Sequence, residues 1–202
     1  MARLEAAIKL LYYPTPVSVM ERIARYVKVQ CDRKQAIVDT CAGTGEAARV
    51  LADAWGLTFH GVELEAGRAA ELADVADVAL HGSYSQLQLP PDQGYAVLFL
   101  NPPYDYARVD DNTVDRQEVQ FLSRSMQLVA RDGLVVFVPP SSLLRRTDFR
   151  RLVQDNMRNV AFFRFPDEEF KAFGVVTPQL YDPVSVLMLD FVGFTDMVAS
   201  AD

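Results

Sequence analysis

Cysteine and histidine are scarce in this chain, with two of each among 202 residues. Cys31 and Cys41 do not form a CxxC pair and do not lie near clustered histidines, which argues against a disulfide framework and against structural zinc. His60 and His81 have no metal-ligand or catalytic-triad partner at a recognisable spacing. We therefore expect both histidines to be structural, and we expect no metal site.

Long hydrophobic runs are also missing. No uninterrupted apolar stretch reaches the length of a membrane span, and the N-terminus lacks a cationic region followed by an apolar core and a small-residue cleavage site. We therefore expect a cytoplasmic protein without a membrane partner. Half of the residues are hydrophobic, which lets a chain of this length bury one good core. We expect a single domain over residues 1–202 with a frayed tail at 195–202.

Positive charge is in the minority. Lysine and arginine number 20 against 27 aspartates and glutamates, so the net charge is -7, which counts against autonomous binding of nucleic acid. The later part of the chain nevertheless gathers basic residues: Arg145, Arg146, Arg150, Arg151, Arg158 and Arg164. These could contact phosphates. The simpler interpretation is a solvated helix face paired with Asp148, Asp155 and Glu168.

Strand-like and helix-like segments alternate along the chain. The strand-like runs are 36–39, 58–64, 75–80, 95–100 and 134–138, and helical composition is found at 47–55, 66–73 and 115–129. This alternation predicts an α/β fold whose mostly parallel sheet is covered by helices on both faces. Two further β-rich runs, 160–165 and 184–191, predict an antiparallel closing pair at the C-terminal end.

A glycine-bearing turn follows the first predicted strand. Its residues run from Asp39 to Gly45 and precede a predicted helix, and Gly43 and Gly45 would allow positive φ and close approach of a ligand to the backbone. The turn matches neither GxGxxG nor a phosphate loop, which disfavours a dinucleotide or phosphate site. About twenty residues later Glu63 ends the second predicted strand, where a carboxylate accepts hydrogen bonds from ribose hydroxyls in nucleoside-binding folds. Glu65 is the competing candidate, although we expect it to belong to the next helix.

The most informative segment is Asn101-Pro102-Pro103-Tyr104, which directly follows the apolar run 95–100. The prolines fix their own φ angles and push the preceding residue toward an extended conformation, so the Asn101 side chain and nearby carbonyls become fixed acceptors. Tyr104 offers a flat face for stacking. The segment therefore predicts a site for a planar amine at the carboxyl edge of the sheet.

Taken together, these motifs resemble a known family. The order Tyr13-Pro14-Thr15-Pro16, the 39–45 turn, Glu63 and the 101–104 tetrapeptide is similar to that of S-adenosylmethionine-dependent methyltransferases of exocyclic amines, especially the gamma-type adenine-N6 DNA methyltransferases. The resemblance covers nearly the whole chain. Segments 116–122 and 133–139 also resemble uncharacterised bacterial and phage members of that superfamily. The fold implied is a Rossmann-like class I methyltransferase with a mostly parallel seven-stranded sheet and an antiparallel C-terminal strand.

The resemblance also implies roles for individual residues. The N-terminal segment 1–30 would border the cofactor, S-adenosylmethionine, with Thr15 and Pro16 at its methionine end and Glu63 on its ribose. The residues implied to wrap the centre of the cofactor are Asp39, Cys41, Ala42, Gly43 and Gly45, with Asn101 also nearby. The family often has an acidic residue near the end of the third strand for the cofactor's adenine. Here that run is His81-Gly82-Ser83-Tyr84, so Ser83 would accept a hydrogen bond and Tyr84 would pack on the ring.

The implied reaction is methylation of the adenine amine in nucleic acid, with DNA favoured over RNA. The Asn101 side-chain oxygen and the Pro102 carbonyl would each accept an amine hydrogen, Pro103 would hold the turn, and Tyr104 would stack on a base that is flipped out or single-stranded. No segment remains for a target-recognition domain, so we expect either weak, poorly specific activity of the chain alone or dependence on a partner subunit.

Three alternatives stay open. The same tetrapeptide resembles the site of methyltransferases of protein glutamine amides and of ribosomal RNA bases. A non-catalytic cofactor-binding subunit of a larger modification or defence complex is the second alternative. An NAD-dependent oxidoreductase is the third and weakest, because it would leave the tetrapeptide unexplained.

Overall fold

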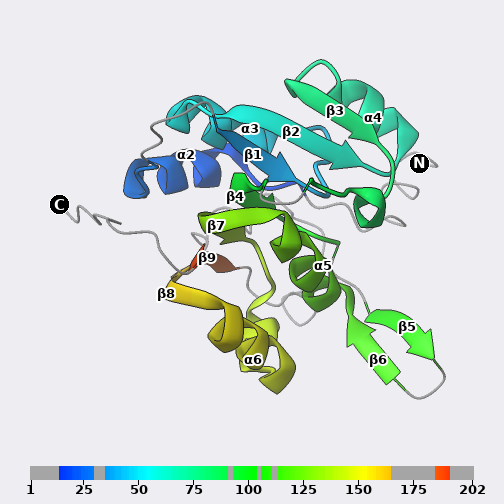
Figure 1. Cartoon of the computed structure of the whole chain (residues 1–202), viewed down its shortest axis with the longest axis vertical. Helices are drawn as coiled ribbons and strands as arrows, with labels where there is room; N and C mark the ends of the chain where they lie inside the picture. Colours follow the sequence, from blue (N-terminus) through cyan, green and yellow to red (C-terminus); the bar gives the residue numbers. More distant parts are fainter. Residues whose placement is uncertain are drawn as a thin grey trace, which may run out of the picture.

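The computed structural model describes residues 14–29, 35–90, 93–103, 106–110, 113–164 and 185–191. A twisted sheet forms its centre, with the strand order β3-β2-β1-β4-β7-β9-β8 (Figure 1). Strands β3, β2, β1, β4 and β7 are parallel to one another, whereas β9 is antiparallel to both β7 and β8. The strands, in the order of the sheet, are Val78–His81, Thr58–Glu63, Ala36–Asp39, Tyr95–Leu100, Val129–Phe137, Ser185–Phe191 and Met157–Arg164.

Helices cover both faces of the sheet. One group consists of α2 (Val17–Tyr26), α3 (Glu46–Trp55) and α4 (Ala66–Leu72), and the other of α5 (Gln117–Ser125) and α6 (Thr147–Asn156). Neighbouring strand residues enter opposite cores: Ile37 packs with α2 and α3, and Val38 packs with α5 and α6. The central strands are apolar on both faces because they are buried on both, as parallel strands usually are. The predicted α/β fold with a mostly parallel sheet is confirmed.

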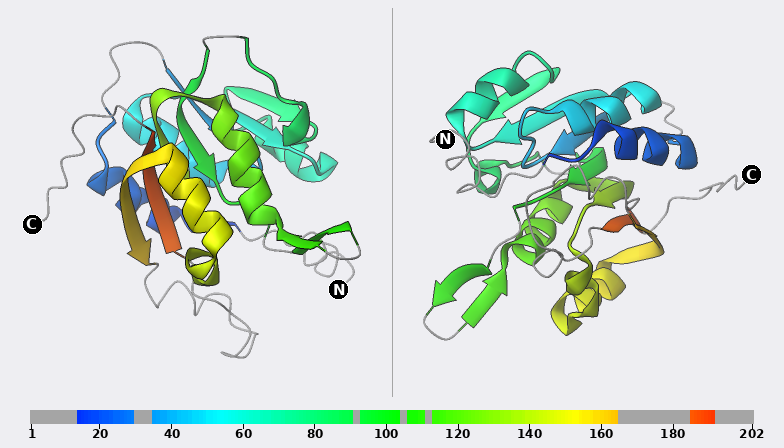
Figure 2. Two further views of the ribbon diagram at one scale, coloured as in Figure 1. Left: turned by 60° about the horizontal axis from the view of Figure 1, so that its bottom comes forward. Right: turned by 180° about the vertical axis from the view of Figure 1, so that it is seen from behind.

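A small β-hairpin stands out from this body. It pairs β5 (Tyr106–Asp110) with β6 (Thr113–Arg116), and Figure 2 shows it projecting beside the start of α5. The helix expected over 115–129 is therefore too long at both ends. Its first residues belong to β6, and its last residues form a 3₁₀ turn, η2 (Met126–Leu128), before β7 begins at Val129.

Two other boundaries also differ from expectation. The third strand begins at Val78 rather than at residue 75, because the amides of Val75 and Ala76 still donate to the Leu72 carbonyl at the end of α4. Strand β7 begins before the expected residue 134, and Asp132 in it has a φ of 67°. Helix α2 was not predicted from sequence, and α6 was predicted only as the alternative to a phosphate-binding cluster.

Within the described ranges, no helix has the length and apolar character needed to cross a membrane.

Candidate active site

A pocket opens at the carboxyl edge of the sheet, where β1 and β4 end side by side. Strands β1 and β4 are parallel, and Val38 is paired with Leu98. The turns after Asp39 and after Leu100 therefore meet at this edge. In open α/β sheets this edge is where ligands bind. The pocket is lined by Pro14, Thr15, Asp39, Cys41, Ala42, Thr44, Glu46, Ala47, Phe99 and Asn101. Predicted residues from three separate motifs, among them Thr15, Asp39 and Asn101, thus line the same pocket.

A hydrogen bond joins the two motifs that are furthest apart in sequence. The Asn101 Nδ2 atom donates to the Thr15 hydroxyl at 2.9 Å, across 86 residues of chain. Thr15 is 7% exposed and lies just before Pro16, the N-cap of α2, and Pro102 is buried. With its nitrogen on Thr15, the Asn101 amide directs its oxygen away from Thr15. Tyr104 lies outside the described residues.

Asp39 is the buried carboxylate of the pocket. It is 3% exposed, and its Oδ1 accepts a hydrogen bond from the Cys41 amide at 2.9 Å. Burial raises the pKa of Asp39 to about 7, against the opposing effect of the Cys41 hydrogen bonds. Burial and the neighbouring Asp39 also raise the pKa of the Cys41 thiol, so Cys41 is a poor nucleophile.

Glu63 ends β2, the strand next to β1, and its carboxylate accepts three hydrogen bonds. Its Oε2 accepts the Gly43 amide at 2.8 Å, and its Oε1 accepts the Glu65 amide at 2.8 Å and Arg68 Nη2 at 2.7 Å. The carboxylate therefore ties the glycine turn to the end of β2. Glu65 instead caps α4, because its side chain accepts the amides of Gly67 and Arg68. The competing candidate thus belongs to the helix, as expected.

The two glycines of the turn have left-handed backbone conformations, and packing also requires a glycine at Gly45. Both have positive φ, 59° at Gly43 and 88° at Gly45. A Cβ on Gly45 would lie 2.6 Å from Leu72 Cδ1 and 3.1 Å from the Phe59 ring. The missing side chain at Gly45 is therefore required for packing against β2 and α4, and Gly45 does not line the pocket. The positive φ expected from sequence is confirmed at both glycines, and close approach of a ligand to this turn stays a prediction.

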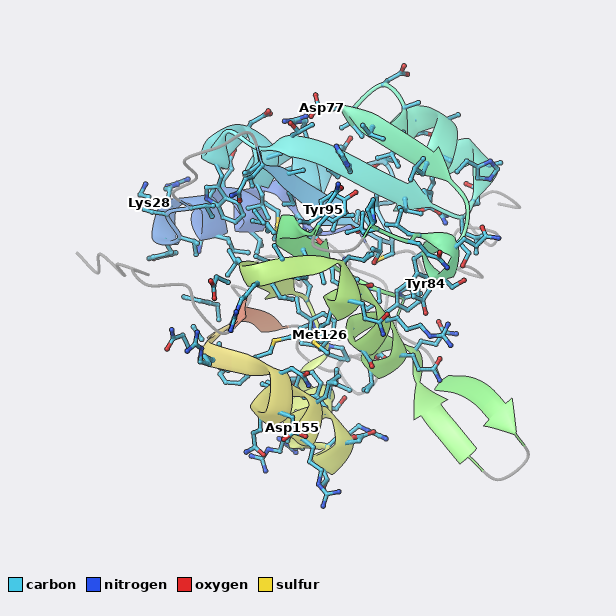
Figure 3. The ribbon with its side chains drawn as sticks, in the orientation of Figure 1. Lys28, Asp77, Tyr84, Tyr95, Met126 and Asp155 are labelled. Carbon is cyan, nitrogen blue, oxygen red and sulfur yellow. The ribbon has the colours of Figure 1, made fainter. Side chains whose placement is uncertain are left out.

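Ser83 and Tyr84 lie after β3, apart from the pocket lining. The Ser83 hydroxyl is hydrogen-bonded to the Ser85 hydroxyl at 2.8 Å, and Tyr84 begins the 3₁₀ turn η1 (Tyr84–Gln86). The Tyr84 ring stacks on Phe121 of α5, with centroids 4.0 Å apart and an angle of 24° between planes (Figure 3). This role of Phe121 was not predicted from sequence. The feature that could have indicated it is an aromatic residue on the helix after the Asn-Pro-Pro turn.

The two histidines have local partners. His60 Nδ1 lies 3.0 Å from the Tyr95 hydroxyl, and His81 Nε2 lies 3.2 Å from the Leu64 carbonyl. Burial lowers the pKa of His60. Among the described residues, no three side chains of histidine, cysteine, aspartate or glutamate are grouped as metal ligands would be.

Comparison with known families decides the family membership. The model of the "Uncharacterised methyltransferase family (DUF6094)" matches residues 1–178. The chain belongs to this family. The description of this family and the class I methyltransferase fold agree with the predicted cofactor, S-adenosylmethionine. No curated protein has a sequence similar enough to be matched.

Solved structures show the same fold at low sequence identity. A putative class I S-adenosylmethionine-dependent methyltransferase from Listeria monocytogenes has a TM-score of 0.72 and 17% identity, over 92% of this chain and 64% of that one. A type I restriction-modification methyltransferase subunit from Streptococcus thermophilus has a TM-score of 0.63 and 16% identity, over 92% and 46%. A methyltransferase from Pyrococcus furiosus has a TM-score of 0.58 and 14% identity, over 89% and 86%. The chain thus spans less than two thirds of the first two.

Proposed function

We propose that this methyltransferase transfers a methyl group from S-adenosylmethionine to the exocyclic amine of adenine in DNA. The observation that carries the proposal is the contact of Asn101 with Thr15 in a pocket that Asp39 also lines. It brings the amine-accepting tetrapeptide of the adenine-N6 type to the motifs implied to hold the cofactor. The fold likeness to a restriction-modification methyltransferase subunit supports a DNA substrate.

The side chains of the site fit this cofactor. S-adenosylmethionine carries an ammonium group, a sulfonium and ribose hydroxyl donors, and the site presents two buried carboxylates, Asp39 and Glu63, at the ends of adjacent strands. Asp39 would face the cationic end, with Thr15 and Pro16 bordering it. Glu63 already accepts three hydrogen bonds, which leaves about one of its four lone-pair sites for the ribose. Ser83 and Tyr84 would lie toward the adenine.

The reaction needs alignment more than acid or base strength. When bound, the cofactor supplies an electrophilic methyl group, whose transfer to nitrogen leaves a thioether and releases one proton from the amine. An aryl amine is a weak nucleophile because its lone pair is delocalised into the ring. The Asn101 oxygen and the Pro102 carbonyl would each accept one amine hydrogen, which favours the pyramidal nitrogen and stabilises its developing positive charge.

The rest of the tetrapeptide would hold the base. Pro103 is partly exposed and fixes the turn, and Tyr104 is proposed to stack on the adenine. A base inside a duplex cannot enter such a pocket, so the target must be flipped out or presented single-stranded. Stacking of Tyr104 is expected to contribute about 1–3 kcal/mol to base binding.

The test uses the full chain with tritiated-methyl S-adenosylmethionine. Separate pools of DNA, RNA and protein are incubated with it and digested, and the labelled monomer is identified. We expect N6-methyladenine from DNA. Label on glutamine or on an RNA base would contradict the proposed substrate.

The variant that tests the acceptor is Asn101→Ala. It removes the amine acceptor but neither buried carboxylate, so we expect cofactor affinity by calorimetry to stay nearly unchanged and transfer to fall by at least about a hundredfold. An unchanged transfer rate would contradict the role of Asn101.

A second function has one observation in its favour. The chain spans only 46% of the restriction-modification subunit to which its fold is similar, so a cofactor-binding subunit that works with a partner is the alternative. Cofactor binding without labelling of any nucleic acid, even after addition of cell extract, would favour that alternative.

A further inference from the structure

An arginine-rich segment follows β7 and begins at the same edge of the sheet as the pocket. It consists of the 3₁₀ turn η3 (Ser141–Arg145) and the helix α6. Residues 141–156 contain four arginines and two aspartates, a net charge of +2 in a chain whose overall charge is -7. A local charge of opposite sign to that of the whole molecule favours an anionic partner.

Strand pairing places this segment next to Asn101. Strands β4 and β7 are parallel neighbours, and the Val138 amide donates to the Leu100 carbonyl at 2.9 Å. The chain leaving β7 therefore starts beside the first residue of the tetrapeptide. Only Pro139 and Pro140 separate it from η3, whose five residues advance the chain by about 10 Å. Arg145, the last residue of η3, is therefore separated from the end of β7 by only a short stretch of chain.

The segment is held rigidly and presents its charges outward. Leu143, Phe149 and Val153 are buried in the core between the sheet and α6, which fixes the orientation of the helix. Arg145, Arg150 and Arg151 are exposed.

Ion pairing does not neutralise this surface. Arg146 is paired with Asp148, with Nη2 and Oδ2 2.6 Å apart. Within the described part of the chain, no ion pair involves Arg145, Arg150 or Arg151. Among the described residues, the paired helix face expected from sequence is therefore formed only between Arg146 and Asp148. Glu168, which was also expected to take part, lies outside the described residues.

We propose that η3 and α6 bind the phosphate backbone of the DNA strand that carries the target adenine. This inference rests on the proposed function, since it supplies the strand contact that the reaction needs. Guanidinium groups match phosphate geometry in a bidentate fashion and give up hydration easily. Helix α6 is about 15 Å long, which corresponds to about four phosphates along one strand. An acidic protein with one such basic surface would bind DNA weakly and with little sequence preference.

The experiment measures binding of a fluorescein-labelled, adenine-containing single-stranded DNA by anisotropy between 50 and 200 mM salt. The test variant is Arg145→Gln with Arg151→Gln. The matched control is Arg124→Gln with Arg131→Gln, which removes the same charge from exposed side chains near the opposite edge of the sheet, where β7 begins. We expect the test variant to bind about tenfold more weakly and the magnitude of its salt slope to fall by about 1.4, or about 0.7 for each lost arginine on a single strand, while the control stays close to the wild type. Arg145→Lys with Arg151→Lys should restore most of the slope.

The outcomes separate this inference from the proposed function. Equal losses in the test variant and the control, or no loss in either, would overturn the docking surface even if the wild type labels adenine. Absence of DNA binding by the wild type at 50 mM salt, or tighter binding of an RNA of the same sequence, would also overturn it. Arginine-dependent binding without labelling of adenine would support the surface and refute the proposed reaction.

Discussion

At the residue scale, Asp39 combines two conflicting demands. A buried carboxylate is unfavourable as an anion, and its pKa of about 7 means that half of the molecules carry it protonated near neutral pH. A methyl donor with positive charge, however, would be bound best by the anion. Folding and binding therefore favour different protonation states of the same side chain.

The first prediction concerns the stability of Asp39→Asn. Because the folded-state pKa lies above the unfolded value of 3.8, the wild type loses free energy of unfolding as the pH rises from about 4 to about 7, and no more above that. Asparagine can keep the Cys41 amide bond without ionising. We expect the variant to gain about 3 kcal/mol over the wild type between pH 5 and pH 8, measured by urea unfolding without cofactor.

A matched control is Asp148→Asn on the surface. Arg146 lowers the pKa of Asp148, so its effect on stability should be constant across that range. A stability difference for Asp39→Asn that does not change with pH would show that Asp39 is already ionised at pH 5.

Individual residues also show how much of the site can be predicted from sequence. The pocket brings together Thr15, Asp39, Cys41, Ala42 and Asn101, all of which the motifs indicated. Phe121 and Arg68 were not foreseen, because their roles come from contacts made across elements: a ring stacked on Tyr84 and a guanidinium on Glu63. A motif records positions along the chain, and such contacts depend on how helices cross the sheet.

At the element scale, the turn between β1 and α3 depends on Gly45. Both Gly45 and Gly56, at the other end of α3, have positive φ, but a Cβ on Gly56 would meet nothing within 4 Å. Their alanine variants therefore share the backbone strain and differ in packing. We expect Gly56→Ala to lower the free energy of unfolding by about 1 kcal/mol and Gly45→Ala by about 3 kcal/mol. Similar losses in the two variants would show that Leu72 moves aside freely.

A second element-scale prediction concerns the link between the sheet and α5. The hydroxyls of Thr40, after β1, and Ser125, at the end of α5, lie 2.9 Å apart, and both residues are almost fully buried. Thr40→Val leaves the Ser125 hydroxyl buried without this partner, which should cost about 1–3 kcal/mol of stability. The double variant Thr40→Val with Ser125→Ala should be less destabilised than the sum of the single variants, measured as a double-mutant cycle. Additive losses would mean that the two hydroxyls do not interact.

Element boundaries show where prediction from sequence ends. The parallel strands were recognised because burial on both faces makes them continuously apolar, as in 95–100. The hairpin β5–β6 was missed, and the last two residues of its second strand were assigned to a helix, because its polar residues carry no strong period. Helix α6 is amphipathic, but its arginines could be interpreted as a paired face or as a binding surface. Only the observed ion pairs distinguish the two.

At the scale of the whole molecule, the pocket joins three parts of the chain that are distant in sequence. Thr15 precedes α2, Asp39 ends β1, and Asn101 follows β4, so a ligand held among them ties the N-terminal segment to the centre of the sheet. Binding to such a site stabilises the folded molecule as a unit. At a hundred times the dissociation constant, the gain is about 2.7 kcal/mol.

The last prediction couples this gain to pH through Asp39. A bound cation lowers the pKa of Asp39 below its value of about 7 in the free protein, so binding releases a proton in the range between the two values. At a fixed cofactor concentration, we therefore expect the cofactor-induced rise in Tm to grow from pH 6 to pH 8, although the free protein itself becomes less stable over part of that range. Calorimetry in buffers of different ionisation enthalpy should detect the released proton directly. In Asp39→Asn both the proton release and the pH dependence of the Tm shift should disappear, and if they persist, another group near the cofactor carries the titration.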